Sequence, residues 1–210
     1  MNKNKRIALY GGAFNPPTRA HREIVELLIP RFDEVWVIPC GPRPDTDKPE
    51  INDTDPIDRA MMADFAFRGF PKSSVKLFDL ENNTFTRNHV VEEMFRHCGE
   101  LWHVVGTDHV SPNNDGLSFI ERTWEQGKRL WQELNFAVVV RSGYPLRTRY
   151  LPSHHELFYP SRRESSSFVR ERVSRREAIS ELVMPEVGAH IERYNLYRGH
   201  RRLSPAPFRL

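Results

Sequence analysis

The sequence predicts an α/β protein with a doubly wound parallel sheet, helices on both faces of the sheet and a C-terminal helical segment. Two observations carry this prediction. Short apolar runs recur along the chain with few polar interruptions, as in strands that are covered on both faces. Stretches with helical spacing of apolar residues lie between these runs. Alternation of this kind builds β-α-β units and therefore a parallel sheet.

Five apolar runs have the length of strands. In chain order they are Ile7–Tyr10, Val35–Ile38, Val75–Leu77, Leu101–Val105 and Phe136–Val140. Two long polar, proline-containing segments, residues 41–54 and 142–155, are predicted to be loops. Loops of this length in compact domains are usually functional or mobile.

Apolar residues three and four positions apart predict the helices. Between the strands these are His21–Ile29, Pro56–Phe67 and Asn88–Phe95. The apolar face of the second helix is predicted to carry Ile57, Ala60, Met61 and Phe65.

From Ser165 onward the pattern is helical, first through Phe168, Val169 and Val173 and then through Ile179, Leu182 and Val183. Pro185 is predicted to begin a last helix, because proline is favoured at the first helical position. Residues 1–199 are predicted to form a single nucleotide-binding domain, and the basic tail 200–210 to be poorly ordered.

Composition is that of a soluble globular protein. The 210 residues, 39% hydrophobic and 28% charged, are enough for one domain with a substantial core. The net charge of +3 is too small to indicate a nucleic-acid partner by itself. Cys40 and Cys98 have no metal or redox spacing and are interpreted as small packed hydrophobes.

No apolar run approaches the roughly 18 residues that span a bilayer, and the first residues, MNKNKR, lack the apolar core of a signal peptide. A cytoplasmic protein with no membrane partner is therefore expected. The sequence leaves the oligomeric state open, a homo-oligomer included.

The most informative segment is RIALYGGAFNPPTRAH, residues 6–21. An apolar run closed by two glycines predicts a buried strand that ends in a tight turn. The two prolines lead to a helix that begins near Thr18. Thr18 and His21 are three residues apart and share one face of its first turn, where free N–H groups favour an anion. The segment therefore predicts a phosphate site.

Two further segments carry polar groups to the ends of predicted elements. Gly106 and Asp108 directly follow a strand, where an aspartate can hold ribose hydroxyls or a metal. Ser165–Ser167 begin a helix, and Arg170 can reach an anion bound there. In an open α/β sheet, ligands bind outside the carboxyl ends of the strands.

Each of these motifs has a structural alternative when it stands alone. A threonine or serine at a helix start is usually a cap, and an aspartate after a strand is usually a turn residue. Their joint occurrence in this order and spacing favours a nucleotide site.

With these motifs, the chain resembles the nicotinate/nicotinamide mononucleotide adenylyltransferases of the HxGH-type nucleotidyltransferase superfamily, over most of its length. The segment from Gly11 looks like the opening GGTFDPxHxGH. His21 falls on the second histidine of that motif, and Thr18 on the first, where the superfamily also uses threonine. Ala20 replaces the intervening glycine. Ser165–Arg170 is similar to ISSTxIR, with glutamate in place of isoleucine.

The rest of the resemblance lies in the middle and at the end of the chain. Gly106-x-Asp108 resembles the GxD motif, and Trp124 with the strand that leads to Arg141 resembles W…FVVxxRPG. Residues 84–86 look like the SYT segment near the pyridine ring, and residues 187–197 like VxxYIxxxxLY. Lys48 falls near the lysine of the PPHK loop, although the preceding histidine is missing.

The resemblance implies a Rossmann-like fold and an adenylyltransferase that joins ATP to nicotinate or nicotinamide mononucleotide. The mononucleotide phosphate attacks the α-phosphorus of ATP in line and releases pyrophosphate, without a protein nucleophile. Mg²⁺ is the implied cofactor, bound mainly through the ATP phosphates, and ATP and a pyridine mononucleotide are the implied partners.

The resemblance also implies the site residues. The catalytic residues are expected to be His21, Thr18 and Arg170. ATP binding is expected of Gly11, Gly12, Ala13, Phe14, Gly106, Asp108, Ser165, Ser166, Ser167 and Arg170. Binding of the second substrate is expected of Asn15, Arg43, Lys48, Thr84, Phe85, Thr86, Trp124 and Arg141.

Three other functions stay open on the sequence. One is another small-molecule transferase of the superfamily, which acts on phosphopantetheine or uses CTP. Another is a nucleotide-binding regulator without turnover, because Thr18 stands where an imidazole is commoner. The third is a nucleic-acid binder that uses the more basic C-terminal half.

Overall fold

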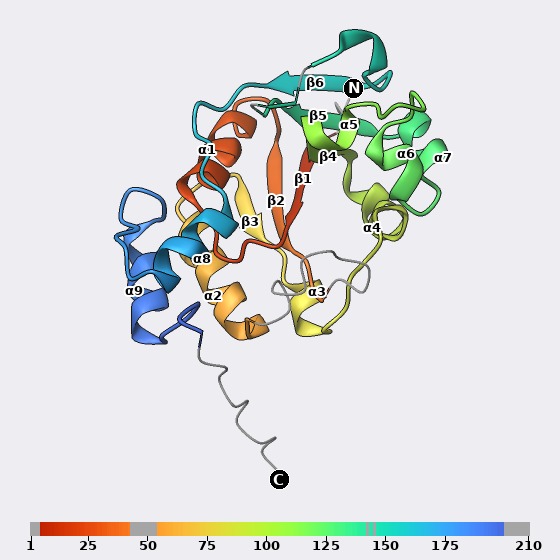
Figure 1. The fold of residues 1–210 in the computed structure, drawn as a ribbon. Helices are drawn as coiled ribbons and strands as arrows, with labels where there is room; N and C mark the ends of the chain where they lie inside the picture. The colour runs from red at the N-terminus through yellow and green to blue at the C-terminus, as the bar shows by residue number, and fades with distance from the viewer. Residues whose placement is uncertain (1–4, 43–53, 142, 145, 200–210) are drawn as a thin grey trace.

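The computed structural model describes residues 5–42, 54–141, 143–144 and 146–199. Within these ranges, six parallel strands form one sheet in the order β3-β2-β1-β4-β5-β6 (Figure 1). The strands are β1 Arg6–Gly12, β2 Glu34–Pro39, β3 Ser73–Val75, β4 Glu100–Gly106, β5 Asn135–Val139 and β6 His155–Phe158. This order reverses direction between β1 and β4, which is the switch point where doubly wound sheets bind ligands.

Helices cover both faces of the sheet. They are α1 Arg19–Leu28, α2 Pro56–Phe67, α3 Phe78–Glu81, α4 Asn88–Phe95, α5 Thr107–Val110, α6 Phe119–Thr123, α7 Gly127–Glu133, α8 Ser166–Ser174 and α9 Pro185–Arg193, with 3₁₀ turns at Arg96–Cys98 and Thr148–Tyr150. In Figure 1, α1, α2, α8 and α9 lie on one side of the sheet, and α4 to α7 lie on the other. The predicted Rossmann-like fold is confirmed.

Alternating side chains of the strands explain the two layers. In β1, Ala8 and Tyr10 pack into the cluster under α1 and α2, whereas Ile7 and Leu9 pack into the cluster under α4. Successive side chains of a strand point to opposite faces, so a strand covered on both sides is apolar throughout. This is why the strands read as continuous apolar runs in the sequence.

Two strand predictions need correction. The third strand is Ser73–Val75, two residues earlier than predicted, because it pairs with residues 35–37 of β2. The sixth strand, β6, was not predicted, and it begins at His155, the last residue of the predicted loop 142–155. It is a four-residue edge strand in which only Phe158 is fully buried, so it leaves no apolar run to detect.

The helix bounds of α2 and α4 are confirmed, but the predicted buried face of α2 is wrong. Ile57 is 71% exposed and Met61 is 42% exposed, whereas Asp58 and Arg59 are buried together with Met62. Asp58 is hydrogen-bonded to the His190 side chain of α9, and Arg59 donates to the Ala13 carbonyl in the loop after β1. Because both residues have partners, the helix turns a partly charged face to the core.

The C-terminal region is also less helical than predicted. Helix α8 ends at Ser174, and Val183 enters the core from a non-helical turn before α9. Phe168 is exposed, while Val169 and Val173 are buried as predicted. The predicted tail, 200–210, lies outside the described residues. Within the described ranges, no helix has the length and apolarity to cross a bilayer.

Candidate active site

The loop between β1 and α1 meets the start of α8, although 150 residues separate them in the sequence. The Ser166 hydroxyl donates to the Pro16 carbonyl at 2.8 Å, and Nη1 of Arg170 donates to the Asn15 carbonyl at 2.8 Å. Both segments lie at the carboxyl end of β1, beside the switch point. The two motifs that the sequence predicted to form one anion site are therefore in direct contact.

Thr18 caps α1 and holds His21 in a reciprocal pair of hydrogen bonds. The Thr18 side chain accepts from the His21 backbone N–H at 3.3 Å, and Nδ1 of His21 accepts from the Thr18 N–H at 3.0 Å. The threonine hydroxyl also donates to the Glu164 carbonyl at 3.2 Å. Because Nδ1 is an acceptor, the proton of a neutral His21 lies on Nε2. The residue spacing thus fixes the tautomer.

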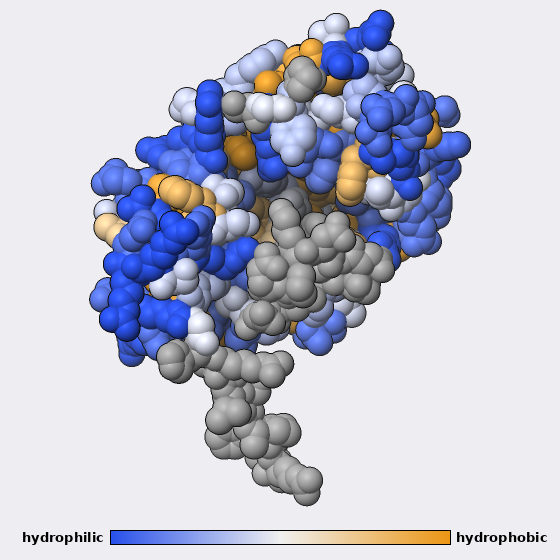
Figure 2. Space-filling view, in the orientation of Figure 1, coloured by the Kyte–Doolittle hydropathy of each residue, from blue (hydrophilic) through white to orange (hydrophobic). Residues whose placement is uncertain are grey.

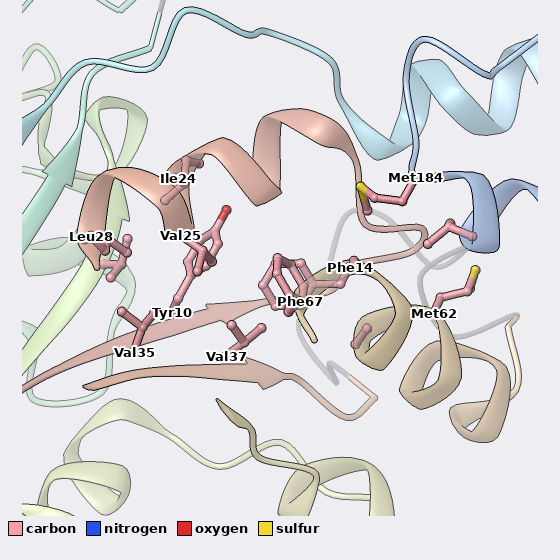
Figure 3. Packing of buried hydrophobic residues seen from close by; sticks show 14 of the residues in the cluster. Tyr10, Phe14, Ile24, Val25, Leu28, Val35, Val37, Met62, Phe67 and Met184 are labelled. Atoms are coloured by element: carbon pink, nitrogen blue, oxygen red, sulfur yellow. The ribbon is translucent and has the colours of Figure 1, made fainter. Parts of the chain in front are cut away.

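Three aromatic rings fix the position of the imidazole. The Phe14 ring lies edge-on to His21 at 5.3 Å between centroids and also contacts Tyr10 and Phe67, each at 5.2 Å. Figure 3 shows Tyr10 rising from β1 toward α1, with Phe14 and Phe67 together near the end of that strand. Phe14 has a φ of 45°, a backbone conformation that residues other than glycine rarely adopt, and the packing of its ring holds that conformation.

Burial, together with the smaller effect of the nearby Arg141 guanidinium, lowers the pKa of His21 from 6.5 to about 4. The imidazole is therefore neutral at pH 7 and offers Nε2–H as a hydrogen-bond donor. Burial also raises the pKa of Tyr10, whose buried hydroxyl has no hydrogen-bond partner in the described part of the chain.

The predicted residues after β4 and β5 also come together. Asp108 pairs with Arg141 at 3.4 Å, and the Arg141 N–H donates to the Thr107 hydroxyl at 2.9 Å. A Cβ at Gly106 would lie 2.1 Å from Oδ1 of Asp108, so glycine is required for this approach. That oxygen is buried and has no partner among the described residues, which leaves one acceptor for a ligand hydroxyl.

The serines of α8 have different positions. Ser165 is the N-cap and accepts from the Phe168 N–H, and Ser166 is engaged with the β1–α1 loop. Ser167 is exposed and lies 3.4 Å from Nη2 of Arg170. The hydroxyls of Ser165 and Ser166 are therefore engaged within the protein. The backbone N–H groups in the first turn of α8 are the donors that the site presents.

Of the two glycines that end β1, the structure requires a glycine at one position. A Cβ at Gly12 would approach the Phe14 ring to 3.0 Å, so this position needs glycine for packing. Gly11 is exposed and has open space around it. Ala13 is held through its carbonyl by Arg59.

Residues 84–86, predicted near the second substrate, lie at the end of β2. A Cβ at Gly41 would lie 1.8 Å from the Thr84 carbonyl oxygen, so the segment after β2 and the segment at residue 84 are in contact there. The Thr86 N–H and hydroxyl both donate to Oδ1 of the buried Asp79, at 3.1 and 2.5 Å. Phe85 is half-buried between them.

The remaining predicted contacts are more dispersed. Trp124 packs against the cluster under α5 to α7, with its ring 6.5 Å from both His109 and Phe136. Asn15 is fully buried, and its Oδ1 accepts from the Tyr197 hydroxyl at 2.5 Å. Arg43 and Lys48 lie outside the described residues.

The surface over α8 and α9 is strongly hydrophilic, as Figure 2 shows. Arg172 of α8 and Arg175, which caps its C-terminal end, form ion pairs with Glu177 and Glu171, at 3.2 and 2.7 Å. Arg170 instead turns to the β1–α1 loop. In the described part of the chain, no cluster of three or more histidine, cysteine, aspartate or glutamate residues could hold a metal ion.

The sequence model of the cytidylyltransferase-like family matches residues 9–172, from β1 into α8. The chain belongs to the cytidylyltransferase-like family. The match begins within β1 and ends beyond Arg170, so it includes the β1–α1 loop, the residues after β4 and β5, and the start of α8. The resemblance seen in the sequence is thereby confirmed.

Three similar proteins each cover more than nine-tenths of the chain. A probable nicotinate-nucleotide adenylyltransferase of Geobacillus thermodenitrificans is 26% identical, over 91% of this chain and 86% of that protein. One from Bacillus cytotoxicus is 28% identical, over 92% and 98%. The structure of Plasmodium falciparum nicotinic acid mononucleotide adenylyltransferase complexed with NaAD has a TM-score of 0.71 and 23% identity, over 92% and 97%.

Three residues of this cytidylyltransferase-like site were not predicted from the sequence. Arg59 holds the Ala13 carbonyl, Tyr197 holds Asn15, and Tyr10 lies beside His21. Arg59 offered one signal, since it lies three, four and seven residues before the apolar residues Met62, Ala63 and Ala66.

Proposed function

We propose that this protein is a nicotinate-nucleotide adenylyltransferase, which transfers the adenylyl group of ATP to a pyridine mononucleotide and releases pyrophosphate. The observation that carries the proposal is the junction of the Thr18–His21 pair with the start of α8. The loop that leads to the neutral imidazole of His21 is bonded there to Arg170 and to the start of α8, at the carboxyl end of β1 beside the switch point of the sheet. The similar proteins, which cover 91% and 92% of the chain, are named for this activity.

In the proposed reaction, a phosphate oxygen of the mononucleotide attacks the α-phosphorus of ATP in line, and the bond to the β-phosphate oxygen breaks. Phosphoryl chemistry of this kind needs positioning and charge stabilisation rather than a protein nucleophile. His21 donates its Nε2–H to an α-phosphate oxygen and stabilises the charge that builds there. Its neutral state suits a donor, because no proton has to leave the imidazole during the reaction.

Arg170 and the N–H groups at the start of α8 hold the β- and γ-phosphates and the leaving pyrophosphate. A guanidinium can bind phosphate through two parallel hydrogen bonds, and a helix N-terminus adds partial positive charge. Thr18, which is fully buried, acts on the reaction through His21. We therefore assign it as a positioning residue.

Asp108 and Gly106 hold the ATP ribose in this proposal. The unpartnered Oδ1 of Asp108 accepts from a ribose hydroxyl, and Arg141 orients the carboxylate through its other oxygen. Residues 84–86 and Trp124 form the pocket for the pyridine ring. The names of the similar proteins favour nicotinate over nicotinamide as the ring of the acceptor.

Mg²⁺ fits this site as an ion held by phosphate oxygens and water, because the described residues form no group of three or more histidine, cysteine, aspartate or glutamate side chains that could hold it. When bound, it neutralises charge on the triphosphate. The residues of this chain that share that task are Arg170 and His21.

The test is an assay of the purified protein with ATP, MgCl₂ and either nicotinate or nicotinamide mononucleotide, in which dinucleotide and pyrophosphate are both measured. We expect one dinucleotide per pyrophosphate, with nicotinate mononucleotide preferred. His21→Ala should lower kcat on the order of 10²- to 10³-fold with little change in ATP affinity. CTP in place of ATP tests the cytidylyl reaction. Turnover with CTP but not with ATP would overturn the proposal.

A further inference from the structure

Arg59 is a charged side chain at an unusual place, inside the core behind the β1–α1 loop. It comes from α2 and is only 2% exposed. Its Nε and Nη2 donate to the Ala13 carbonyl at 3.1 and 2.7 Å, and Nη2 also donates to the Cys40 carbonyl at 2.5 Å. Among the described residues, no carboxylate pairs with it. Burying a charge without a counter-charge is unfavourable, so an apolar residue would serve better if packing were the only requirement.

The bond from Arg59 fixes the orientation of one peptide group. The Ala13–Phe14 peptide is trans, so its C=O and N–H point in opposite directions. Because the carbonyl points to Arg59, the Phe14 N–H points away from α2. No described residue accepts a hydrogen bond from this N–H. The Phe14 ring lies against His21, so the residue that carries this N–H is a direct neighbour of the imidazole.

A second side chain holds the same loop two residues later. The Tyr197 hydroxyl, beyond the end of α9, donates to Oδ1 of the fully buried Asn15. Burial raises the pKa of Tyr197, so its hydroxyl keeps the proton that it donates. The Asn15 carbonyl in turn accepts from Arg170, so a shift of Asn15 also shifts the arginine of the phosphate site.

We propose that Arg59 and Tyr197 are positioning residues, which hold residues 13–15 from the core side so that the Phe14 N–H and Arg170 face the ATP phosphates. This inference rests on the proposed adenylyl transfer and adds to it two residues that touch neither substrate. The left-handed backbone of Phe14 agrees with it, since strained residues persist where the surroundings dictate them.

Substitutions at the two positions test the proposal, each with a matched control. Arg59→Met removes all three hydrogen bonds to the two carbonyls, Arg59→Lys keeps the charge and a single donor group, and Tyr197→Phe removes a single hydroxyl. The control for Arg59 is Arg22→Met, because Arg22 also donates to a carbonyl, that of Ala66, away from the site. The control for Tyr197 is Tyr194→Phe, on the exposed side of the same turn.

We expect Arg59→Met to lower kcat about 10²-fold and to leave the KM of the mononucleotide within about twofold, since a misplaced phosphate contact acts on the transition state. Arg59→Lys should recover at least about tenfold of that loss, and Tyr197→Phe should lower kcat about three- to tenfold. Both controls should turn over at the wild-type rate. Should Arg59→Met not fold, Arg59→Lys and Tyr197→Phe carry the test. Variants that lose thermal stability but keep the wild-type kcat would overturn the proposal.

A binding measurement separates this inference from the proposed reaction. The backbone amide resonance of Phe14 is followed by ¹⁵N NMR while inorganic pyrophosphate is added to the full chain. We expect a downfield proton shift in the wild-type protein and in both control variants, and a smaller one in Arg59→Lys. If the wild-type protein makes no dinucleotide but this shift is present, the reaction is wrong and the positioning role stands. An unresponsive Phe14 amide in an active wild-type enzyme would overturn the positioning role alone.

Discussion

The backbone N–H of Thr18 donates to Nδ1 of His21 across 3.0 Å, and this bond decides which nitrogen of the imidazole faces the site. The same two residues form a capping box at the start of α1, since the Thr18 hydroxyl accepts from the His21 N–H. A capping box usually serves only to stabilise the start of a helix, but this one also sets the tautomer of the expected phosphate donor. Threonine at this position is thus compatible with catalysis, because the second imidazole of the family motif has its own partner.

Thr18→Ala should lower the free energy of unfolding by about 1 kcal/mol, the usual cost of losing an N-cap. It should also lower kcat, but by less than His21→Ala, because the backbone N–H of residue 18 still holds Nδ1. Thr18→Ser should restore both values. Urea unfolding and steady-state kinetics measure the two effects.

Ser118→Ala is the matched control, because Ser118 and Glu121 form the same kind of capping box at the start of α6. We expect a similar loss of stability there without a loss of kcat. A Thr18→Ala protein with wild-type stability and wild-type kcat would show that this pair has no role.

The lowered pKa of His21 predicts a specific dependence of stability on pH. Between pH 6.5 and about 4, the unfolded chain binds a proton at His21 that the folded protein does not bind. The free energy of unfolding therefore falls as the pH is lowered through this window. His21→Gln should make the dependence shallower. Unfolding curves at several pH values would contradict this if both proteins showed the same slope.

Arg141→Gln should raise the pKa of His21, because it removes the nearby positive charge. The pKa should stay below 6.5, since burial is the larger cause of the shift. An NMR titration of the His21 ring protons measures both values. A wild-type midpoint near that of an exposed histidine would contradict the neutral donor.

Arg170→Ala should mainly weaken binding of ATP and pyrophosphate. Loss of a hydrogen bond from a charged group corresponds to about 10- to 100-fold in affinity. Isothermal titration calorimetry with each ligand measures this directly. Arg175→Ala is the control at the other end of α8, because Arg175 caps that end and is paired with Glu171 at the surface. Unchanged ATP affinity in Arg170→Ala would remove this arginine from the triphosphate site.

The buried pair of Asp58 and His190 links α2 to α9, with Oδ1 and Nε2 2.9 Å apart. Asp58→Ala should lower the free energy of unfolding by about 1–3 kcal/mol, because it leaves a buried imidazole nitrogen without this partner. His190→Ala should cost a similar amount, and the double variant should cost less than the sum. Strictly additive effects in urea unfolding would mean that the two residues are not coupled.

The helix α2 shows where a sequence pattern stops being informative. Its bounds follow from Pro56 and from the apolar content, and both are confirmed. Its orientation is not, because Ile57 and Met61 looked like the core face, while the real core face includes Asp58 and Arg59. A charged side chain can be buried only where hydrogen-bond partners are present. For Asp58 and Arg59 those partners lie in α9 and in the loop after β1.

The alternation of strands and helices, the capped start of α1 and the three polar motifs at strand and helix ends can be read from the amino-acid order alone. These are local properties, which follow from hydrophobic period, glycine, proline and capping residues within a few positions of each other. The packing of the layers sets the strand order, the contact of residues 15 and 16 with α8, the tautomer and lowered pKa of His21, and the support of the loop by Arg59 and Tyr197. Hydrogen bonds between residues up to 182 positions apart, and the burial of charges, depend on how the layers pack, and no short stretch of sequence encodes that.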